Sequence, residues 1–450
     1  MIFMETMGNL RRTHYCGTLR ARDAGTQMTV AGSIAKCRDK GGVIFADLRD
    51  TTGILQLIFD DSTDRAVFEK ASGLKSEYVV IAAGTLRERE AKTDKIPTGE
   101  VELFVTELRV LSGAQTTPFE VRDGINVNDQ LRLKYRYLDL RRPSMHEPIV
   151  VRSKIAKVVR DYYDEQHFVE IETPMLIKST PEGARDYLVP SRVQPGHFYA
   201  LPQSPQLYKQ ILMLSGFDRY YQIVRCFRDE DLRADRQPEF TQIDMEMSFV
   251  TEDDVMAMNE GLVKRVFREV LGVDVETPFR RMPYSEAMAR YGSDKPDTRF
   301  GLELQDVTDV LRESGFAVFK SAVEAGGSVR ALAYDMVLNG CELGGGSIRI
   351  NDPAVQDRML KALGFSEERA RESFGFLMDA YQYGAPPHGG MAFGFDRMVM
   401  LMLKRDSIRD VIAFPKVQNA GEPMSGCPET VEEKQLRELS IAYAPIETEE

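Results

Sequence analysis

The chain has 450 residues, 43% of them hydrophobic and 28% charged, which is enough for two or three domains that each bury a core. No apolar run of about 18 residues occurs, so we expect no membrane span. The opening residues, MIFMETMGNLRR, lack the apolar core of a signal peptide, which predicts a cytoplasmic protein. The net charge of −12 argues against a general nucleic-acid coat, because such binding depends on neutralising phosphates.

The five cysteines and five histidines are scattered along the chain, with no CxxC pair and no zinc-ligand spacing. We therefore expect a reducing compartment and no structural zinc. Residues 1–45 carry seven Lys or Arg against three Asp or Glu within an acidic chain. A local basic surface and an ordinary solvated face both explain that balance.

Residues 1–111 are predicted to form a small all-β unit. Short apolar or alternating runs are separated by Gly and Asp turns, at Gln27–Ile34, Val43–Leu48, Ile54–Phe59, Tyr78–Ala83 and Val101–Leu111. Asp50-Thr-Thr-Gly53 predicts a hairpin turn between the second and third runs. Five such strands fit a Greek-key barrel of the oligonucleotide-binding (OB) type, although another small barrel or sandwich fits the pattern as well.

After the polar connector Ser112–Pro118, helical and extended patterns follow one another irregularly. Apolar residues in Ser153–Gln166 recur on one face of a helix. Thr251 and Asp254 predict a capped helix that ends at Gly272. Because strands and helices do not alternate regularly, we favour an α+β fold with an antiparallel sheet over a doubly wound one.

Three stretches in this half carry residues suited to chemistry. In the first, the extended runs Tyr220–Phe227 and Phe240–Phe249 flank a loop rich in both signs of charge. A salt-bridged surface hairpin explains that loop. A phosphate clamp, in which Arg side chains grip a nucleotide beside an aromatic ring, explains it too.

The second stretch, Cys341–Ile350, places Glu342 before three glycines and Arg349 after them, with Asp335 upstream. A glycine turn is the plain interpretation. The carboxylates also suit Mg²⁺ with a nucleotide, and the Arg suits a carboxylate substrate. In the third stretch, Gly389–Arg397, glycines let a backbone approach a ligand, and Arg397 at a strand-to-helix junction could meet a terminal phosphate. A glycine-rich strand under a buried helix is the alternative.

In chain order, these stretches resemble the signature motifs of the class II aminoacyl-tRNA synthetases, in the variants of the bacterial aspartyl type. Further similarity lies in Arg136–Arg142, Ser179–Asp186, Leu201–Gln210 and Arg409–Lys416, so the resemblance covers nearly the whole chain. It implies an anticodon-binding OB barrel and a catalytic domain built on an antiparallel sheet. It also implies an ATP- and Mg²⁺-dependent ligase that activates L-aspartate and loads it onto tRNA(Asp), acting as a homodimer.

The resemblance further implies roles for individual residues. The ATP-binding set would be Arg228, Glu230, Gln237, Phe240, Glu342, Gly394 and Arg397, of which Arg228, Glu230 and Arg397 would be catalytic. Mg²⁺ would be held by Asp335 and Glu342. Aspartate would be bound by Glu182, Ser204, Gln206, Lys209, Asp244 and Arg349. The anticodon would meet Arg38, Phe45, Gln56 and Glu100.

The sequence departs from the family pattern in two regions. In the barrel, Ser33 stands where Trp is typical, Cys37 where Arg is typical, and Ile58 where an aromatic residue is common. Further on, the family carries an insertion domain and then a strand pair with two adjacent histidines, but here Ala322–Arg330 runs directly into Ala331. We expect that this junction removes most of the insertion domain and part of the catalytic sheet.

The predicted division is a barrel at 1–111, a linker at 112–145, a first catalytic part at 146–300, an insertion remnant at 301–330 and a second catalytic part at 331–450. The junction leaves a second hypothesis open, namely a tRNA-binding relative that has lost activation. A third, an aspartate-activating amide ligase, is disfavoured because such an enzyme has no use for an anticodon-binding barrel.

Overall fold

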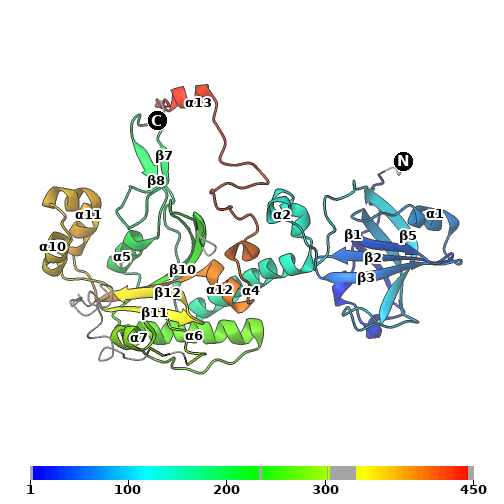
Figure 1. Cartoon of the computed structure of the whole chain (residues 1–450), viewed down its shortest axis with the longest axis horizontal. Helices are drawn as coiled ribbons and strands as arrows, with labels where there is room; N and C mark the ends of the chain where they lie inside the picture. The colour runs from blue at the N-terminus through cyan, green and yellow to red at the C-terminus, as the bar shows by residue number, and fades with distance from the viewer. Residues whose placement is uncertain (1–3, 233–235, 302, 305–330, 444–450) are drawn as a thin grey trace, which may run out of the picture. The chain divides into compact units, whose positions relative to one another are not determined.

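The computed structural model describes residues 4–232, 236–301, 303–304 and 331–443 (Figure 1). The chain forms two compact units, Met1–Val127 and Asn128–Glu450. The boundary falls inside the segment 112–145 that the sequence predicts as a linker, so the second half of that segment belongs to the second unit. Nearly all of the predicted insertion remnant 301–330 lies outside the described residues.

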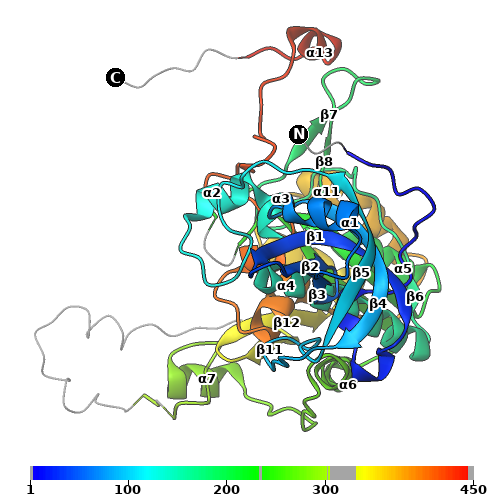
Figure 2. The same ribbon diagram turned by 90° about the vertical axis from the view of Figure 1, so that its right-hand side faces the viewer.

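The first unit is a closed barrel with the strand order β1-β2-β3-β5-β4, as expected for an OB fold. Inward-facing side chains from all five strands make one apolar core, and α1 packs against β5 (Figure 2). The elements are β1 (Gln27–Asp39), β2 (Ile44–Asp50), β3 (Gly53–Phe59), α1 (Arg65–Ser72), β4 (Val79–Glu88) and β5 (Val101–Ser112), after the 3₁₀ turns Cys16–Thr18 and Ala21–Asp23.

The barrel closes because β1 pairs with two strands. Its first half is antiparallel to β4 and its second half to β2. Pairing of Arg49 with Ile54 and of Asp50 with Gly53 confirms the predicted hairpin turn. β1 is longer than the predicted run, because its polar residues beyond Ile34 continue the pairing without an apolar pattern that would mark them.

The second unit is built on a six-stranded sheet with the order β11-β12-β13-β10-β9-β6. The pairs from β11 to β9 are all antiparallel, but β6 runs parallel to β9, so the prediction of an antiparallel sheet was wrong at this edge. A parallel neighbour needs a long crossover, which the chain between β6 and β9 supplies. The strands are β6 (Val169–Glu170), β9 (Arg219–Phe227), β10 (Glu239–Ser248), β11 (Ala333–Leu338), β12 (Cys341–Ile348) and β13 (His388–Gly394).

Three helices bury one face of this sheet: α4 (Pro143–Glu165), α6 (Glu252–Leu271) and α12 (Phe395–Met402). α6 has the predicted capping box at Thr251 and Asp254, and it ends at Gly272 in a left-handed conformation. α4 begins ten residues before the predicted helix, because Pro143 occupies its first turn, where proline is favoured, and Pro148 hides the periodic pattern.

The remaining described elements surround the sheet. α5 (Gln206–Leu214) packs against β9, β10 and α11, with α10 beside α11 (Figure 1). Their bounds are α2 (Asp129–Lys134), α3 (Arg136–Asp139), β7 (Leu188–Pro190), β8 (Phe198–Ala200), α7 (Tyr284–Tyr291), α10 (Pro353–Ala362), α11 (Glu367–Tyr381), a 3₁₀ turn Ile408–Val411 and α13 (Glu433–Glu438). Among the described helices, none is long and apolar enough to cross a membrane.

A buried guanidinium ties the start of the second unit to its end. Arg136 is 2% exposed and donates to the carbonyl oxygens of Ala413 (2.9 Å) and Ile412 (2.8 Å). It also donates to the fully buried carboxylate of Asp139 at 2.7 Å, which accepts from Arg142 as well. The predicted linker therefore ends in a network that fixes residues 412–413.

Replacing Arg136 by Met should lower the free energy of unfolding by about 3–5 kcal/mol, because buried acceptors lose their donor. Urea unfolding followed by far-UV circular dichroism measures this. Lys157→Met is the control, since Lys157 pairs with Asp161 on the exposed surface of α4 and should cost less than about 1 kcal/mol. Equal losses for the two variants would contradict a structural role for the Arg136 network.

Candidate active site

The sheet face opposite the three core helices carries the polar side chains. Because side chains alternate along a strand, Asp244 and Glu246 on β10 lie on this face, while Met245 lies in the core. In the centre of the face, a β-carbon on Gly345 would lie 2.4 Å from Asp335 Oδ1, and one on Gly390 would lie 2.1 Å from Glu246 Oε2. Glycine at these two positions therefore makes room for the carboxylates. The three glycines of Cys341–Ile350 lie inside β12 and do not form a turn.

Four charged side chains from three elements meet on this face, and we call them the charge cluster: Lys209, Asp244, Glu246 and Arg349. Lys209 Nζ lies 2.6 Å from Asp244 Oδ1 and 3.3 Å from Glu246 Oε2. Arg349 donates through Nε (2.9 Å) and Nη2 (3.1 Å) to the two oxygens of Glu246. Two cations therefore converge on one carboxylate.

Burial decides the electrostatics of the charge cluster. It raises the pKa of Asp244 above its ordinary value, against the attraction of Lys209. Burial also acts to raise the pKa of Glu246, but Lys209 and Arg349 outweigh it, and the pKa of Glu246 is lowered. Asp244 Oδ2 is buried without a hydrogen-bond partner. The two positive and two negative side chains of the charge cluster balance one another. Asp244 Oδ2 is left as an acceptor for a further donor.

His388, at the start of β13, is fully buried beside this cluster. Its Nδ1 lies 2.8 Å from the carbonyl oxygen of Pro386, and burial lowers its pKa. A carbonyl only accepts, so Nδ1 carries the proton of the neutral ring and Nε2 is an acceptor, buried without a partner. The ring of Tyr381 stacks on His388 with centroids 6.3 Å apart.

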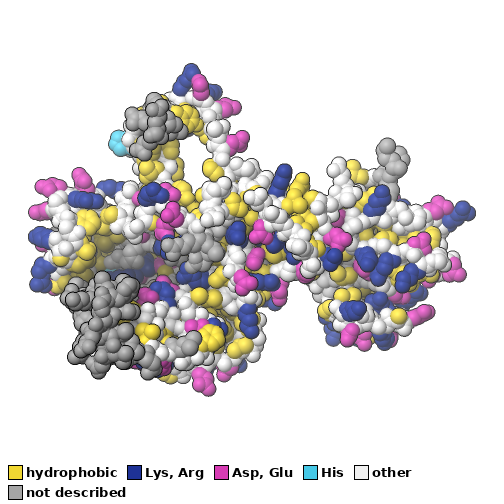
Figure 3. Space-filling model, viewed as in Figure 1, with side chains coloured by type: hydrophobic (Ala, Val, Ile, Leu, Met, Phe, Trp, Pro, Cys, Tyr) yellow, Lys and Arg dark blue, Asp and Glu magenta, His cyan; other side chains and the backbone are white. Residues whose placement is uncertain are grey.

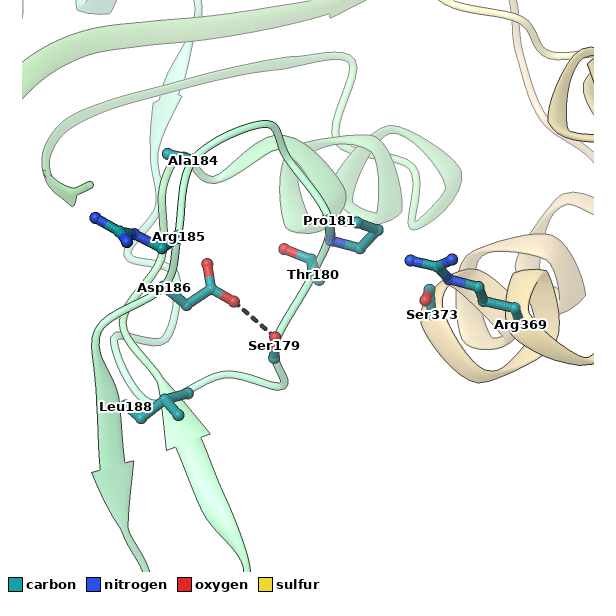
Figure 4. A pocket seen from close by; sticks show the side chains of 9 residues that line it. All are labelled: Ser179, Thr180, Pro181, Ala184, Arg185, Asp186, Leu188, Arg369 and Ser373. Carbon is teal, nitrogen blue, oxygen red and sulfur yellow. Dashed lines mark hydrogen bonds between the residues drawn. The ribbon is translucent and has the colours of Figure 1, made fainter. Parts of the chain in front are cut away.

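The loop before β7 carries Glu182. The Glu182 carboxylate accepts from Ser204 Oγ at 2.8 Å and from Thr180 Oγ1 at 3.2 Å, and burial raises its pKa. Gln203 fixes the loop by bonding both backbone groups of Ala184. Figure 4 shows the open pocket that this loop forms with α11; it is lined by Ser179, Thr180, Pro181, Ala184, Arg185, Asp186, Leu188, Arg369 and Ser373.

The charged loop after β9 brings part of the predicted nucleotide set together. The Arg228 guanidinium lies 5.0 Å from the ring centroid of Phe240, which is half-buried on β10. Glu230 pairs with Arg236 at 2.5 Å. The amide of Gln237 is engaged elsewhere, because it bonds the backbone nitrogen (2.7 Å) and oxygen (3.0 Å) of Lys416. Gln237 therefore holds the C-terminal segment against this loop, and a nucleotide contact stays a prediction.

The remaining predicted residues lie on or beside the glycine-containing strands β12 and β13. Arg397, in the first turn of α12 after Gly394, donates to the carbonyl oxygen of Glu342 at 2.8 Å. The carboxylates of Asp335 and Glu342 both point over Gly345. Burial and the neighbouring Glu342 raise the pKa of Asp335. Two carboxylates beside an open glycine floor fit Mg²⁺, which takes few protein ligands and completes its shell with phosphate oxygens and water.

Gln206 opens α5 one turn before Lys209, and its carbonyl accepts from Gln210. The arrangement thus joins Ser204, Gln206, Lys209 and the β10 carboxylates at one end of the sheet. Sequence reasoning missed three residues of this region: Glu246, His388 and Gln203. Alternation along β10 could have found Glu246, since it lies two residues after Asp244. No local pattern marks His388 or Gln203.

Three of the predicted anticodon residues lie on the outer face of the barrel. Phe45 on β2 is half-buried and pairs across the strands with Arg38. Arg38 donates to Asp47 at 2.8 Å, and Gln56 is buried between Glu102 and Arg89. Glu100 is exposed just before β5. On the face seen in Figure 3, cationic and acidic side chains lie intermixed over the barrel.

An Arg guanidinium near an aromatic ring, two carboxylates over a glycine, and two buried cations on one carboxylate together suit a phosphate-containing substrate beside a small carboxylate. Residues 128–418 match the family described as tRNA synthetases class II (D, K and N), and residues 28–111 match the OB-fold nucleic acid binding domain.

The chain belongs to the class II aminoacyl-tRNA synthetases.

Relatives in this synthetase family align along their full length. The aspartate–tRNA ligase of Ruminiclostridium cellulolyticum is 46% identical, with 98% of this chain and 99% of the relative covered. The aspartate–tRNA(Asp/Asn) ligase of Caldanaerobacter subterraneus is 44% identical, with 97% and 99% covered. These alignments run over 590 and 586 positions, so both relatives hold residues without a counterpart among the 450 of this chain.

Solved synthetases share the fold. The asparaginyl-tRNA synthetase of Pyrococcus horikoshii, complexed with asparaginyl-adenylate, superposes with a TM-score of 0.73 at 23% identity, covering 90% of this chain and 98% of that one. A putative aspartyl-tRNA synthetase from Leishmania major gives a TM-score of 0.71 at 19% identity, covering 92% and 96%. At these identities the likeness concerns the fold alone.

Glu246→Gln should destabilise the synthetase by about 3–5 kcal/mol at pH 7, because Arg349 loses its buried counter-charge and Lys209 is left with Asp244 alone. The lowered pKa of Glu246 makes its stabilisation present above the ordinary glutamate pKa of about 4.3 and lost as pH falls further. The difference from wild type should therefore shrink below about pH 4.

Urea unfolding at pH 7, 5 and 3.5 measures this difference. Glu269→Gln is the matched control, since Glu269 pairs with Arg265 on the exposed side of α6 and should change stability by less than about 1 kcal/mol. A Glu246→Gln deficit that stayed constant with pH would contradict the proposed charge on Glu246.

Proposed function

We propose that this chain activates L-aspartate with ATP and transfers the aspartyl group to the 3′ end of tRNA(Asp). The observation that carries the proposal is the convergence of Lys209 and Arg349 on one carboxylate over a glycine floor. A small substrate with a second carboxylate can share both cations there. The side chain of a neutral amino acid would offer these two cations no additional anionic partner.

The substrate ammonium would be bound at the opposite side of the charge cluster. Asp244 Oδ2 is buried and lacks a donor, which an ammonium supplies. Glu182, on the loop before β7, and Ser204, just before α5, are linked by their 2.8 Å hydrogen bond, and Gln206 begins the helix that carries Lys209. Asp244, Ser204, Glu182 and Gln206 all belong to the predicted aspartate set.

ATP would bind across the other end of the sheet. Phe240 would stack under adenine, Arg228 would bind the α-phosphate with Glu230 beside it, and Arg397 after Gly394 would bind the γ-phosphate. Mg²⁺, when held by Asp335 and Glu342, would neutralise phosphate charge. Family membership supports ATP use, and the two carboxylates over Gly345 support the metal.

The chemistry then follows from position. An oxygen of the substrate α-carboxylate, already ionised near neutral pH, attacks the α-phosphorus. A P–O bond forms, the bond to the β-phosphate oxygen breaks, and pyrophosphate leaves with its electron pair. Arg228 and Arg397 offset the charge on the phosphates, so catalysis consists of positioning and electrostatic stabilisation. A terminal hydroxyl of tRNA next attacks the aspartyl carbonyl, and AMP leaves.

The proposal has two further parts: loss of the insertion domain at the 330/331 junction, and assembly of the chain into a homodimer. Extra positions in both aligned relatives support a chain that lacks an insertion domain. Coverage of 98% of the Pyrococcus horikoshii chain supports retention of the overall synthetase fold, and loss of part of the catalytic sheet stays a prediction. A homodimer through α4 and the edge strand β6 is supported by the exposed apolar residues Val169 (47%) and Leu176 (51%).

Aspartate-dependent exchange of labelled pyrophosphate into ATP, with the purified 450-residue chain, tests activation. Exchange with aspartate and none with asparagine or glutamate is the expected result. A folded protein that binds tRNA(Asp) without any exchange would overturn it in favour of a tRNA-binding relative that has lost activation. Charging assays with tRNA(Asp) and tRNA(Asn) then decide between the two specificities named among the relatives.

Arg349→Leu should lower kcat/KM for aspartate in this exchange by at least about thirtyfold, because a buried carboxylate loses its charged partner. Binding of tRNA(Asp), measured by filter retention, should stay close to wild type. Arg358→Leu, on the exposed side of α10, is the control and should leave exchange unchanged. Loss of tRNA binding together with exchange would contradict the assignment of Arg349 to aspartate.

A further inference from the structure

One row on the outer face of the barrel carries two aromatic side chains, of which the sequence predictions use one. Phe45 on β2 pairs with Ile58 on β3, and Ile58 pairs in parallel register with Phe104 on β5. The three residues thus form one row across neighbouring strands. Their neighbours along each strand, such as Leu57 and Leu103, lie in the barrel core, so the row faces outward.

Phe104 is half-buried, and its ring is held by Arg87 on β4, whose guanidinium carbon lies 5.3 Å from the ring centroid. Arg87 is fixed in turn, because Nε donates to Glu102 at 3.0 Å and Nη2 lies 3.6 Å from Asp60. The Arg87 side chain remains 41% exposed. This is a preorganised guanidinium–ring pair at the surface, next to the row that holds Phe45.

Ile58 separates the two rings and is 6% exposed. Phe45 and Phe104 therefore sit two strand spacings apart, about 9–10 Å. Successive stacked bases lie only about 3.4 Å apart along a strand, so one stacked run cannot place neighbouring bases on both rings. Two bases splayed out of a single strand can, and single-stranded RNA loops are bound in this way on aromatic rings or Arg guanidinium planes.

We infer that Phe104, held by Arg87, is a second stacking platform for an unpaired nucleotide of the tRNA, in addition to Phe45. The inference rests on the proposed function, since it takes tRNA as the ligand. It also assigns the departure at Ile58 a consequence: the aromatic surface absent from β3 is supplied by β5. Arg38 and Arg87, each fixed by an acidic neighbour, flank the row and offer charge to the phosphates.

The test compares Phe104→Leu with Phe104→Tyr in the full chain. Leu keeps apolar bulk and loses the ring, whereas Tyr keeps the ring, so only a stacking role separates the two variants. Phe104→Leu should weaken binding of a tRNA(Asp) anticodon stem-loop by about tenfold or more, and Phe104→Tyr should stay within about threefold of wild type. Phe45→Leu serves as the reference for the first platform.

Tyr15→Leu is the matched control, since Arg12 lies over the Tyr15 ring at 4.8 Å elsewhere on the barrel and outside the row. It should leave stem-loop binding unchanged, and none of the variants should alter binding of a fully paired RNA duplex. Equal affinities for Phe104→Leu and Phe104→Tyr would overturn the inference. Pyrophosphate exchange is measured on the same proteins: its absence would count against the proposed activation, and a Phe104 effect would stand regardless.

Discussion

The second unit depends on one buried carboxylate. Glu246 is fully buried, and it accepts from Arg349 while lying within ion-pair distance of Lys209. Without that carboxylate, Arg349 would be buried without its counter-charge beside Lys209, which would keep Asp244 alone, and burying an unpaired ion costs several kcal/mol. Gly390 is required opposite it, because any side chain there would meet the carboxylate. The charge cluster therefore depends on the glycine-rich strand, because glycine on β13 leaves room for the carboxylate on β10.

The proposed amino-acid and phosphate regions also lie at different places along the sheet. Beside α5, the charge cluster leaves Asp244 Oδ2 without a donor and holds two cations, which suits a substrate ammonium and its side-chain carboxylate. At the opposite strand ends, Arg228 and Arg397 stand beside Phe240 and the Asp335–Glu342 pair, which suits phosphates and their metal. The α-carboxylate of a bound amino acid would lie between the two regions, and the proposed chemistry takes place there. The order of the strands therefore holds these charged side chains in position before any ligand binds.

Much of this could be predicted from the sequence. The barrel, the hairpin turn at Asp50–Gly53, the capped helix α6 and the junction at Arg397 follow from local rules of periodicity, turns and caps. The parallel strand β6 could not be predicted, because two residues carry no pattern and their direction depends on a crossover. Glu246, His388 and Gln203 were missed for another reason: their partners lie far away in sequence, and only the folded sheet brings them together. Gln237 shows the converse, since a residue in a recognised motif hydrogen-bonds the backbone of Lys416 in the C-terminal segment.

The same logic extends to the barrel, where departures from a family pattern are informative only with the strand register in hand. Read along the chain, Ile58 is a lost aromatic residue and Phe104 is an unremarked one. Read across β2, β3 and β5, they are neighbours in one outward row that begins with Phe45. A nucleotide contacts the surface of the barrel, whichever strand supplies it. An aromatic ring on β5 can therefore replace one on β3, and the row still carries two rings. Register therefore turns an apparent defect in the motif into a specific prediction about which side chain meets the nucleotide.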